Sequence, residues 1–407
     1  MLFFSNPQKK ARKAAAEQLH LAQKIYDYRW DVLPEEDAAA LKNVIGRMRH
    51  LLKDKTTPVE GLRILQEEME PIMRRTGGHM YPKHWIADNA EMLLFAAILA
   101  IGFRTFFFQP FKIPTNSMYP SYNGMTGQVY METAEAPNPV ERLFRFVSLG
   151  SRHYSLKAPQ SGELSIGRDY KVVPGRKWFV IPTQKVRYTF YAGDAPMIVD
   201  LPLQFDIRQV FDPLLDGVTP RLSYLRDGTK VIKTGKQVKR GDVAVAFDLL
   251  TGDQLFVDRI TYHFRRPKVG EPIVFRTDNL ENIDRENKGK YYIKRCVGGP
   301  GDTLQIDPPG LLINGQPADA APAFEKNRLQ EGEYPGYVFA GSTSNYPLPF
   351  FKGDKPMTIP EGHYFAMGDN SPNSSDGRMW GLVPQSEIVG RAVVIYYPFS
   401  FRWGLAE

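Results

Sequence analysis

Residues 92–120 read MLLFAAILAIGFRTFFFQPFKIPTNSMYP, and the pattern changes within this stretch. Met92–Phe103 is an uninterrupted apolar run, which is typical of a helix that crosses a membrane or is buried in a core. From Gln109 onward, short runs of Val, Ile, Phe and Tyr alternate with Gly, Pro, Asp and Asn, and no helical period of useful length follows residue 110. The stretch therefore separates a helical first part from a mainly β second part.

The apolar run is long enough for one membrane span. Residues 92–108 would cover about 25 Å as a helix, slightly less than the ~30 Å hydrocarbon core of a bilayer. Arg104 near one end can snorkel to the interface, and Trp85 is placed as an interface aromatic. Basic residues before the run favour a cytoplasmic N-terminus: Arg74, Arg75 and Lys83. We expect a transmembrane helix over 85–108, with a buried core helix as the alternative.

The segment before the run, residues 1–84, is expected to form a cytoplasmic helical hairpin. One helix has apolar residues three and four positions apart: Leu41, Val44, Ile45, Met48 and Leu52. A second helix is expected to start near Pro58, with Thr57 as its cap and Glu60 closing a capping box. An earlier helix over 14–28 also fits the pattern. Residues 1–4 are too short for the apolar region of a signal peptide, so no cleavable leader is expected.

Composition limits the function classes. The 407 residues are 43% hydrophobic and 24% charged, which excludes a disordered chain and a transporter with many spans. The net charge of +7 is diffuse and suits an anionic membrane surface as well as nucleic acid. The single cysteine, Cys296, excludes an internal disulfide and a cysteine-ligated zinc site. The seven histidines have no metal-ligand spacing.

Three segments carry side chains that could do chemistry. Ser117 lies between two prolines in a constrained loop directly after the apolar run. Lys294 lies in a β-branched and aromatic strand within 291–302. A buried lysine has a pKa below its usual ~10.4 and can act as a neutral general base toward a serine. The third segment, 368–381, is polar and supplies hydroxyls and an Asp/Arg pair. Taken one at a time, the three segments also fit ordinary structural interpretations: a serine in a turn, a solvent-exposed lysine on a strand and a polar turn.

Together, and in this order, the segments resemble the type I signal peptidases, the membrane-bound serine proteases that remove signal peptides. Ser117-Met118 with Pro120 is similar to the family's Ser-Met-x-Pro, and it follows an apolar span as in the family. Gly252-Asp253 and the apolar residues after it are similar to the family's Gly-Asp strand. Tyr-Ile-Lys-Arg-x-Val-Gly-x-Pro-Gly-Asp follows at 292–302, and Gly-Asp-Asn…Ser-x-Asp-x-Arg-x-Trp-Gly follows at 368–381. The matching spans are about 92–121 and 250–400.

The resemblance assigns roles by position. Ser117 would be the nucleophile and Lys294 the general base, and Thr115 with the Ser117 backbone N–H would form the oxyanion hole. Ser374 would hydrogen-bond the lysine amine. The supporting ion pair would come from Asp376 and Arg378, with Arg295 beside them. The residues expected to line pockets for small substrate side chains are Ile113, Pro114, Met118, Tyr292 and Ile293. Such a dyad needs no metal and no organic cofactor, so none is expected.

Three positions depart from the family's pattern. Ser371 stands where the family usually has an arginine after Gly-Asp-Asn, and Gly377 stands where a second serine usually follows the aspartate. Asn116 replaces the usual small residue before the nucleophile. None of these changes removes a member of the dyad, so the resemblance still implies activity with an altered set of supporting residues.

The resemblance also divides the second part of the chain. A mainly β catalytic domain with a signal-peptidase-like fold is expected over 109–124 and 250–407. Residues 125–249 replace a short connection, and we expect them to form an inserted β subdomain that packs beside the active site. Two segments of this insert, 157–164 and 231–242, faintly resemble the halves of a biotinyl- or lipoyl-like domain. The context of a modifiable lysine is missing, so no cofactor is implied. A substrate- or partner-docking role for the insert is one hypothesis.

These expectations combine into a single-pass protein of the bacterial cell (inner) membrane, with its catalytic domain outside the cytoplasm. It would be a signal peptidase I, a serine endopeptidase that cuts exported preproteins after small residues at Ala-x-Ala type sites by a Ser-Lys dyad. Its partners would be preprotein signal peptides and membrane lipid, and no nucleic acid. Two alternatives stay open: a catalytically inactive membrane scaffold that binds secreted chains, and a self-cleaving Ser-Lys repressor whose N-terminal helices bind DNA.

Overall fold

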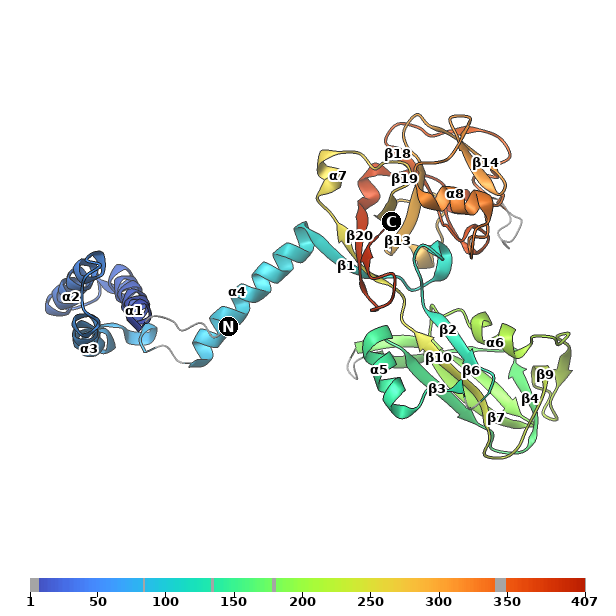
Figure 1. Ribbon diagram of the computed structural model, residues 1–407, viewed down its shortest axis with the longest axis horizontal. Helices are drawn as coiled ribbons and strands as arrows, with labels where there is room; N and C mark the ends of the chain where they lie inside the picture. Colours follow the sequence, from blue (N-terminus) through green and yellow to red (C-terminus); the bar gives the residue numbers. More distant parts are fainter. Residues whose placement is uncertain (1–6, 83–84, 133–134, 178–180, 341–348, 407) are drawn as a thin grey trace. The chain divides into compact units, whose positions relative to one another are not determined.

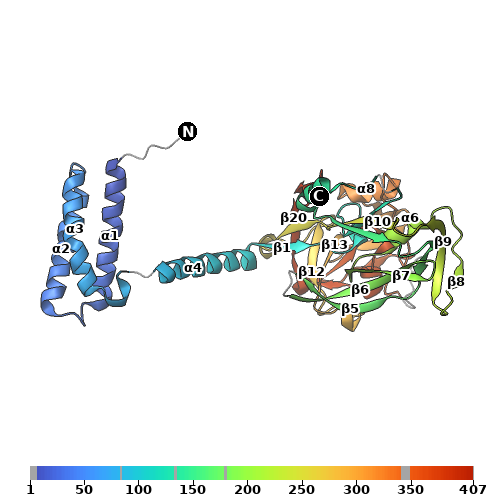
Figure 2. The same cartoon turned by 90° about the horizontal axis from the view of Figure 1, so that it is seen from below.

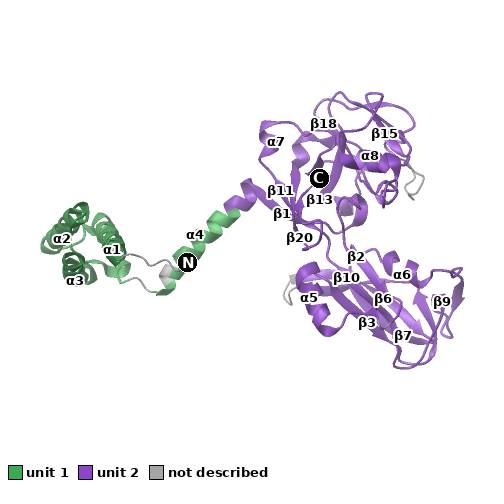
Figure 3. Cartoon of the chain, viewed as in Figure 1, with its two compact units in different colours: residues 1–101 green, residues 102–407 purple. Residues whose placement is uncertain are grey.

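The computed structural model describes residues 7–82, 85–132, 135–177, 181–340 and 349–406. The chain divides into two compact units, Met1–Ile101 and Gly102–Glu407 (Figure 3). The expected absence of a leader at residues 1–4 and the basic residue Lys83 lie outside the described residues. The same holds for the expected boundary at residue 84.

The first unit contains three helices that share one core. They are α1 (Pro7–Arg29), α2 (Glu35–Lys53) and α3 (Val59–Thr76). The expected hairpin is α2 and α3, and the earlier helix over 14–28 is present as α1. The buried residues of the core come from all three helices and include Ile25, Leu41, Met48, Leu65 and Met69. The spacing of three and four residues therefore correctly predicted which helical face is buried.

The start of α3 differs from the expected capping box. Its N-cap residue is Pro58, and no side chain hydrogen-bonds the free backbone N–H groups there. The Thr57 hydroxyl instead donates to the Leu51 backbone carbonyl at 2.9 Å, which ties the start of α3 to the end of α2. The expected cap was wrong because this tertiary contact uses the hydroxyl.

The apolar run forms most of a single long helix, α4 (Trp85–Phe106). Within it, Asn89–Phe106 is long and apolar enough to cross a membrane, and it is the only such segment among the residues that the structure describes. None of this segment is buried against other parts of the chain, which argues against a core helix. The helix ends at Phe106, two residues before the expected end, because β1 already begins at Phe108.

The second unit is built around an eight-stranded antiparallel sheet (Figures 1 and 2). Across the sheet, the strands are β1 (Phe108–Lys112), β11 (Gln254–Asp258), β20 (Ile388–Tyr397), β12 (Pro272–Arg276), β13 (Tyr291–Gly298), β18 (His363–Met367) and β19 (Val383–Pro384), with β21 (Gly404–Leu405) paired to β20. Strands β12, β13 and β18 are largely buried. This burial is consistent with their continuous β-branched and aromatic sequences. The expected mainly β fold class is therefore confirmed.

The loop after β1 explains how an edge strand reaches the middle of the sheet. Residues Ile113, Met118 and Tyr122 of this loop are buried against Val257 of β11 and Val274 of β12. The loop therefore packs across one face of the sheet. This packing carries Ser117 past three strands, β11, β20 and β12, to β13, although among the described strands β1 itself pairs only with β11.

A smaller sheet and a helix follow β13. The sheet contains β16 (Gln316–Pro317), β15 (Gly310–Ile313), β14 (Thr303–Asp307) and β17 (Met357–Thr358), and α8 (Pro322–Leu329) packs beside it. Two short helices, α7 (Thr261–Phe264) and α9 (Gly377–Trp380), complete this part of the chain. Helix α9 itself lies within the polar segment 368–381.

The insert forms two further sheets. One contains β2 (Thr126–Tyr130), β10 (Val243–Leu250) and β3 (Arg152–Lys157), and the other contains β5 (Lys171–Lys177), β6 (Ile181–Ala192), β4 (Gly162–Gly167), β9 (Lys230–Val238) and β8 (Leu222–Tyr224), with β7 (Ala195–Pro202) paired to β6. The two segments singled out in the sequence pair with each other, since Gly162 of β4 lies opposite Val238 of β9. The chain enters and leaves the insert through the adjacent strands β2 and β10.

Two helices in the insert were not indicated by any helical period of useful length in the sequence. They are α5 (Pro139–Leu149) and α6 (Arg208–Leu214). Helix α5 has a complete capping box formed by Asn138 and Glu141, with Pro139 in its first turn. A C-terminal glycine, Gly150, adopts φ 60°. These local signals start and stop a helix of only 11 residues, so a longer period could not reveal it.

Candidate active site

A buried aspartate holds the loop that carries Ser117. The backbone N–H of Ile113 donates to the Asp253 carbonyl at 2.8 Å, and the Asn123 N–H donates to the Asp253 carboxylate at 2.8 Å. Arg402 donates to the other carboxylate oxygen at 2.7 Å. Asp253 therefore joins both ends of the serine loop to the start of β11, and its side chain is fully buried.

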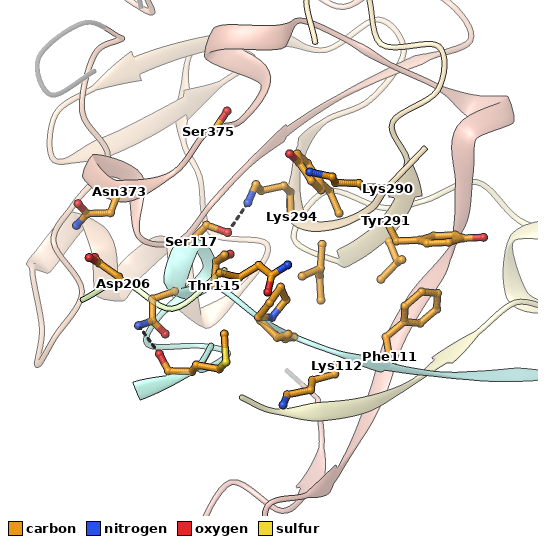
Figure 4. A pocket seen from close by; sticks show the side chains of 18 of the residues that line it. Phe111, Lys112, Thr115, Ser117, Asp206, Lys290, Tyr291, Lys294, Asn373 and Ser375 are labelled. Atoms are coloured by element: carbon orange, nitrogen blue, oxygen red, sulfur yellow. Dashed lines mark hydrogen bonds between the residues drawn. The ribbon is translucent and has the colours of Figure 1, made fainter. Parts of the chain in front are cut away.

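Ser117 and Lys294 lie in direct contact. Ser117 sits in a short 3-10 turn, Asn116–Met118, and Lys294 is on β13. The Lys294 Nζ and the Ser117 Oγ are 2.5 Å apart, although 177 residues separate them in sequence (Figure 4). The fold thus brings together the two residues that the sequence singled out for nucleophile and base.

The surroundings of Lys294 favour its neutral form. Its side chain is almost completely buried, and burial lowers the pKa of Lys294 to about 8, since desolvation disfavours the ammonium. The negative charges of Asp376 and Asp369 act in the opposite direction but are outweighed. A lysine with this pKa has a substantial neutral fraction near neutral pH and can accept a proton from an adjacent hydroxyl.

Ser374 lies beside the dyad without making the expected hydrogen bond. Its Oγ is buried and has no hydrogen-bond partner in the part of the chain that the structure describes. A Cβ atom on Gly368 would lie 2.2 Å from the Ser374 Oγ and 2.3 Å from the Ser117 carbonyl oxygen. The missing side chain of Gly368 therefore lets the segments of Ser374 and Ser117 approach each other closely.

Asp376 and Arg378 form a buried ion pair within the polar segment 368–381. The Arg378 Nε and Nη2 donate to the two carboxylate oxygens of Asp376, each at 2.8 Å. Asp376 also accepts from the Gly368 backbone N–H at 3.1 Å, and Arg378 donates to the Ser371 carbonyl at 2.6 Å. Burial raises the pKa of Asp376, but the charge and hydrogen bonds of Arg378 more than offset this effect, and the net shift is downward. The pair therefore fixes the shape of the polar segment.

Arg295 forms a separate ion pair with Asp369. Its Nε and Nη2 donate to the Asp369 carboxylate at 2.8 and 2.6 Å, and both side chains are buried. The expectation that Arg295 stands beside the Asp376–Arg378 pair therefore needs correction. In the ladder between β13 and β18, Arg295 lies opposite Met367, which places Asp369 two residues further along on the same side.

The polar segment also holds the serine turn directly. The Asn370 backbone N–H donates to the Ser117 carbonyl at 3.2 Å, and the Asn370 amide donates to the Asn116 carbonyl at 3.0 Å. The Asn116 side chain accepts from the Gly124 N–H at 2.8 Å. Asn116, a departure from the family's pattern, thus closes the serine loop on itself. Another departure, Ser371, accepts from the Val338 N–H at 3.1 Å.

A cleft of about 480 Å³ opens at the dyad. Of the residues expected in the site, Thr115, Ser117 and Lys294 line it, together with Ile113, Pro114, Tyr292 and Ile293. Met118 does not line it, because its side chain is fully buried in the core under the loop. The expectation that Met118 shapes a substrate pocket therefore has no support from its position. The cleft volume is within the range of pockets that bind small ligands and peptide side chains.

Several residues of the site were missed in the sequence. Asp253 and Asp369 lie inside the quoted motifs, which could have marked them as residues of the site. Their hydrogen-bond partners depend on the fold and could not be predicted. Arg402 had no signal. Residues of the insert also line the cleft, and they were not singled out: Gln204, Asp206, Arg208 and Gln209. Among the described residues, no group of three or more His, Cys, Asp or Glu side chains could hold a metal ion.

Comparisons with known proteins point to one family. The sequence model of the family described as "Signal peptidase, peptidase S26" matches residues 236–397. This match includes Lys294 and the polar segment 368–381, but not Ser117. A crystal structure of a signal peptidase I from Enterococcus faecalis V583 aligns with 31% of this chain and 97% of its own, at 25% identity and a TM-score of 0.22.

Three curated relatives have similar sequences. A probable signal peptidase I-1 of Synechocystis sp. is 34% identical over 153 residues, which are 38% of this chain and just under two thirds, 66%, of the relative. A signal peptidase I of Aquifex aeolicus is 30% identical, and the match covers 37% of this chain and 70% of the relative. A signal peptidase I of Bacillus licheniformis is 33% identical, with coverages of 37% and 69%.

Proposed function

Because this chain belongs to the type I signal peptidase family, we propose that it is a membrane-bound serine endopeptidase that removes signal peptides from exported preproteins. The observation that carries the proposal is the contact between Ser117 Oγ and the buried Lys294 Nζ at 2.5 Å. The expected cleavage sites have small residues in an Ala-x-Ala pattern. The domain division is part of the proposal, with 109–124 and 250–407 as the catalytic domain and 125–249 as the insert.

The proposed mechanism is acyl transfer through Ser117. Neutral Lys294 accepts the hydroxyl proton while Ser117 Oγ attacks the scissile carbonyl carbon, and the resulting ammonium protonates the leaving amine. The Ser117 backbone N–H and the Thr115 hydroxyl, which lines the cleft, stabilise the oxyanion. Lys294 then activates the water that hydrolyses the acyl-enzyme. No step needs a metal or an organic cofactor.

Supporting groups hold the dyad in place. The Asp376–Arg378 and Arg295–Asp369 pairs are buried, so each fixes its segment without facing the cleft. Ser374 is the candidate for orienting the Lys294 amine. Its buried Oγ has no partner in the described part of the chain and is next to the Ser117 turn across Gly368.

Apolar side chains on the surface of the second unit support membrane lipid as a partner. On α5 the side chains of Val140, Leu143, Phe144 and Val147 are exposed, and the C-terminal tail exposes Phe399, Phe401, Trp403 and Leu405. The two surfaces adjoin, since the Phe399 N–H donates to the Ser148 carbonyl at 2.9 Å. A capped helix with aromatic and basic residues and an outward apolar face is typical of the membrane interface.

We place α4 across the bacterial cell membrane, with the first unit in the cytoplasm and the catalytic domain outside. The support is the length and composition of α4 together with the basic residues Arg74 and Arg75 before it. Protease added to intact and to permeabilised spheroplasts tests this topology. Digestion of the first unit in intact spheroplasts would contradict it.

The activity is tested with a preprotein that carries an Ala-x-Ala site and the detergent-solubilised protein. Cleavage after the last Ala, mapped by mass spectrometry, is expected for the wild type and should be lost in Ser117→Ala and Lys294→Ala. Ser223→Ala and Lys239→Ala are matched controls, because these residues lie in the insert and outside the cleft lining. Cleavage that survives Ser117→Ala would contradict the proposal, and no cleavage by the folded wild type would favour the scaffold alternative.

A further inference from the structure

The insert supplies part of the wall of the cleft that contains the dyad. Residues Gln204, Asp206, Arg208 and Gln209, from the start of α6 and the turn before it, line the same cleft as Ser117 and Lys294. The family's matched region, 236–397, contains none of these residues. This wall is therefore a feature of the insert itself.

The wall is fixed to the serine loop and its continuation. The Gly127 backbone N–H donates to the Gln209 side-chain oxygen at 2.9 Å, and the Gln209 amide donates to the Met125 carbonyl at 3.3 Å. A Cβ on Gly127 would lie 3.0 Å from the Phe205 ring, which shows how closely this part of the insert packs there. The side chains of Phe205 and Val210 are buried in the core of the insert. The position of the wall relative to the dyad is therefore set by packing.

The two ends of the cleft differ in chemistry. In Figure 4, Phe111, Lys112 and Tyr291 lie on one side of Ser117, and Asp206 lies on the other side. The Phe111 and Tyr291 rings are 5.0 Å apart and make the first end aromatic. A peptide cut at Ser117 must extend toward both ends. The aromatic end suits the apolar residues of a signal peptide, so the residues after the cut extend toward the wall of the insert.

Arg208 has a hydrogen-bonding group to spare at this second end. Its Nε and Nη2 donate to Asp206 at 3.0 and 2.8 Å, and its Nη1 has no hydrogen-bond partner among the described residues. Two thirds of the Arg208 side chain is exposed. An exposed pair of this kind is weak, so Arg208 can bind a substrate carboxylate at little cost. Of the other Asp, Glu, Lys and Arg residues that line the cleft, Asp206 is acidic, and Lys112, Lys290 and Lys294 are basic like Arg208.

We propose that Arg208 selects substrates with an acidic side chain among the first residues after the cleavage site, and that Asp206 is an internal partner that competes with the substrate for Arg208. The inference rests on the proposed signal peptidase activity and specifies its substrate class. A strand advances about 3.3 Å per residue, so the second and third residues after the cut are the positions to vary. Arg208 attracts a substrate Glu and repels a substrate Lys at these positions. Both effects raise the ratio of the cleavage rate of a Glu substrate to that of a Lys substrate.

The test compares three preproteins that have Glu, Lys or Ala at the second and third positions after an Ala-x-Ala site. We expect the wild type to cleave the Glu substrate about three- to tenfold better in kcat/KM than the Lys substrate, mostly through KM, at low ionic strength. Salt should reduce this ratio. Arg208→Glu should invert the ratio. Asp206→Asn should increase it, because it releases Arg208 from its internal partner.

The matched control is a second ion pair on the insert, Asp194–Arg226, whose atoms are 3.3 Å apart and which lies outside the cleft lining. Arg226→Glu and Asp194→Asn should leave the Glu/Lys ratio at the wild-type value. A variant is included in the comparison if its melting temperature lies within about 2 °C of the wild-type value, which indicates an intact fold.

The possible outcomes separate the inference from the proposed function. A wild-type ratio near one, or a ratio that Arg208→Glu leaves unchanged while the Ala substrate is still cleaved, would overturn the inference and leave the peptidase activity standing. A control pair that shifts the ratio as strongly as Arg208→Glu would overturn it too, since a general charge effect would then explain the selectivity. No cleavage of the Ala substrate by the wild type would overturn both.

Discussion

At the scale of single residues, the proposed chemistry depends on the burial of Lys294. The same amine on an exposed strand would be an ammonium at neutral pH and could not accept the Ser117 proton. Burial lowers its pKa to about 8, while the nearby aspartates prevent a larger decrease. The residue pair is therefore useful only in the folded protein, where the serine loop covers the lysine.

The first prediction concerns activity and pH. We expect kcat/KM for an Ala-x-Ala preprotein to increase with pH and to level off near pH 8, with a slope of one, because neutral Lys294 is the base. The measurement is a pH series with wild-type protein in detergent. A profile that keeps rising to pH 10 would show that the lysine is not desolvated in the working enzyme.

The second prediction concerns stability. The buried Lys294 that the proposed activity requires should lower the stability of the fold. The folded-state pKa is below the unfolded value of ~10.4, so the folded protein carries the full penalty of a buried ammonium below about pH 8, and stability increases as pH rises from there to about 10. Lys294→Met removes this charge. It should raise the free energy of unfolding at pH 7 by roughly 2–4 kcal/mol, and the gain should vanish near pH 10.

Thermal unfolding followed by tryptophan fluorescence checks this sign, since Trp380 is buried near the site. Lys239→Met, at an exposed position, is the control and should give no gain at either pH. A Lys294→Met variant that is less stable than wild type at pH 7 would mean that the amine stabilises the fold as a cation.

At the scale of elements, a close approach between backbone segments sets the serine loop. A Cβ on Gly252 would lie 1.9 Å from the Ile113 carbonyl oxygen and 2.9 Å from the Gly124 carbonyl carbon. Both neighbours are backbone atoms and cannot rotate away. The glycine therefore allows the start of β11 to pass directly under the loop, where Asp253 makes its hydrogen bonds.

The third prediction follows from this contact. Gly252→Ala should displace the loop, lower kcat/KM at least about tenfold and destabilise the second unit by about 1–3 kcal/mol, the usual range for overpacking. Gly46→Ala is the matched control, because a Cβ at this position in α2 meets nothing within 4 Å. Equal activity of Gly252→Ala and the wild type would refute the view that this contact positions Ser117.

The elements also show what could be predicted from the sequence. The strands around Lys294 and the buried faces of α2 and α3 follow from residue types and spacing alone. Strand register does not, because a shift of one residue changes every partner. The pairing of Arg295 with Asp369 depends on the β13–β18 register, and so it was missed. Met118 was misplaced for a related reason, since the direction of a side chain in a loop depends on the packing beneath it.

At the scale of the whole molecule, the two units have separate cores. The core of α1, α2 and α3 contains only residues between Ala15 and Tyr81, and the cores of the second unit begin after residue 110. The units should therefore unfold in separate transitions. The function of the helical unit is independent of the dyad on this view, because every residue of the cleft lies beyond residue 110.

The fourth prediction tests this separation. Deletion of residues 1–84 should remove one thermal transition and leave kcat/KM for a preprotein in detergent within about twofold of the full chain. Calorimetry and the cleavage assay measure the two parts of the prediction. A large loss of activity on deletion, with the second transition unchanged, would show that the helical unit takes part in substrate capture.

The separation of 177 positions between Ser117 and Lys294 also sets a delay during synthesis of the chain. A ribosome adds about 5–20 residues per second, so the lysine is synthesised about 9 to 35 s after the serine. During this interval the serine hydroxyl has no base, and the loop that holds it lacks its partner strand β11 until the insert has been made. Under the proposed mechanism, the nascent chain therefore cannot act as a protease until Lys294 has been synthesised and β13 has joined the sheet.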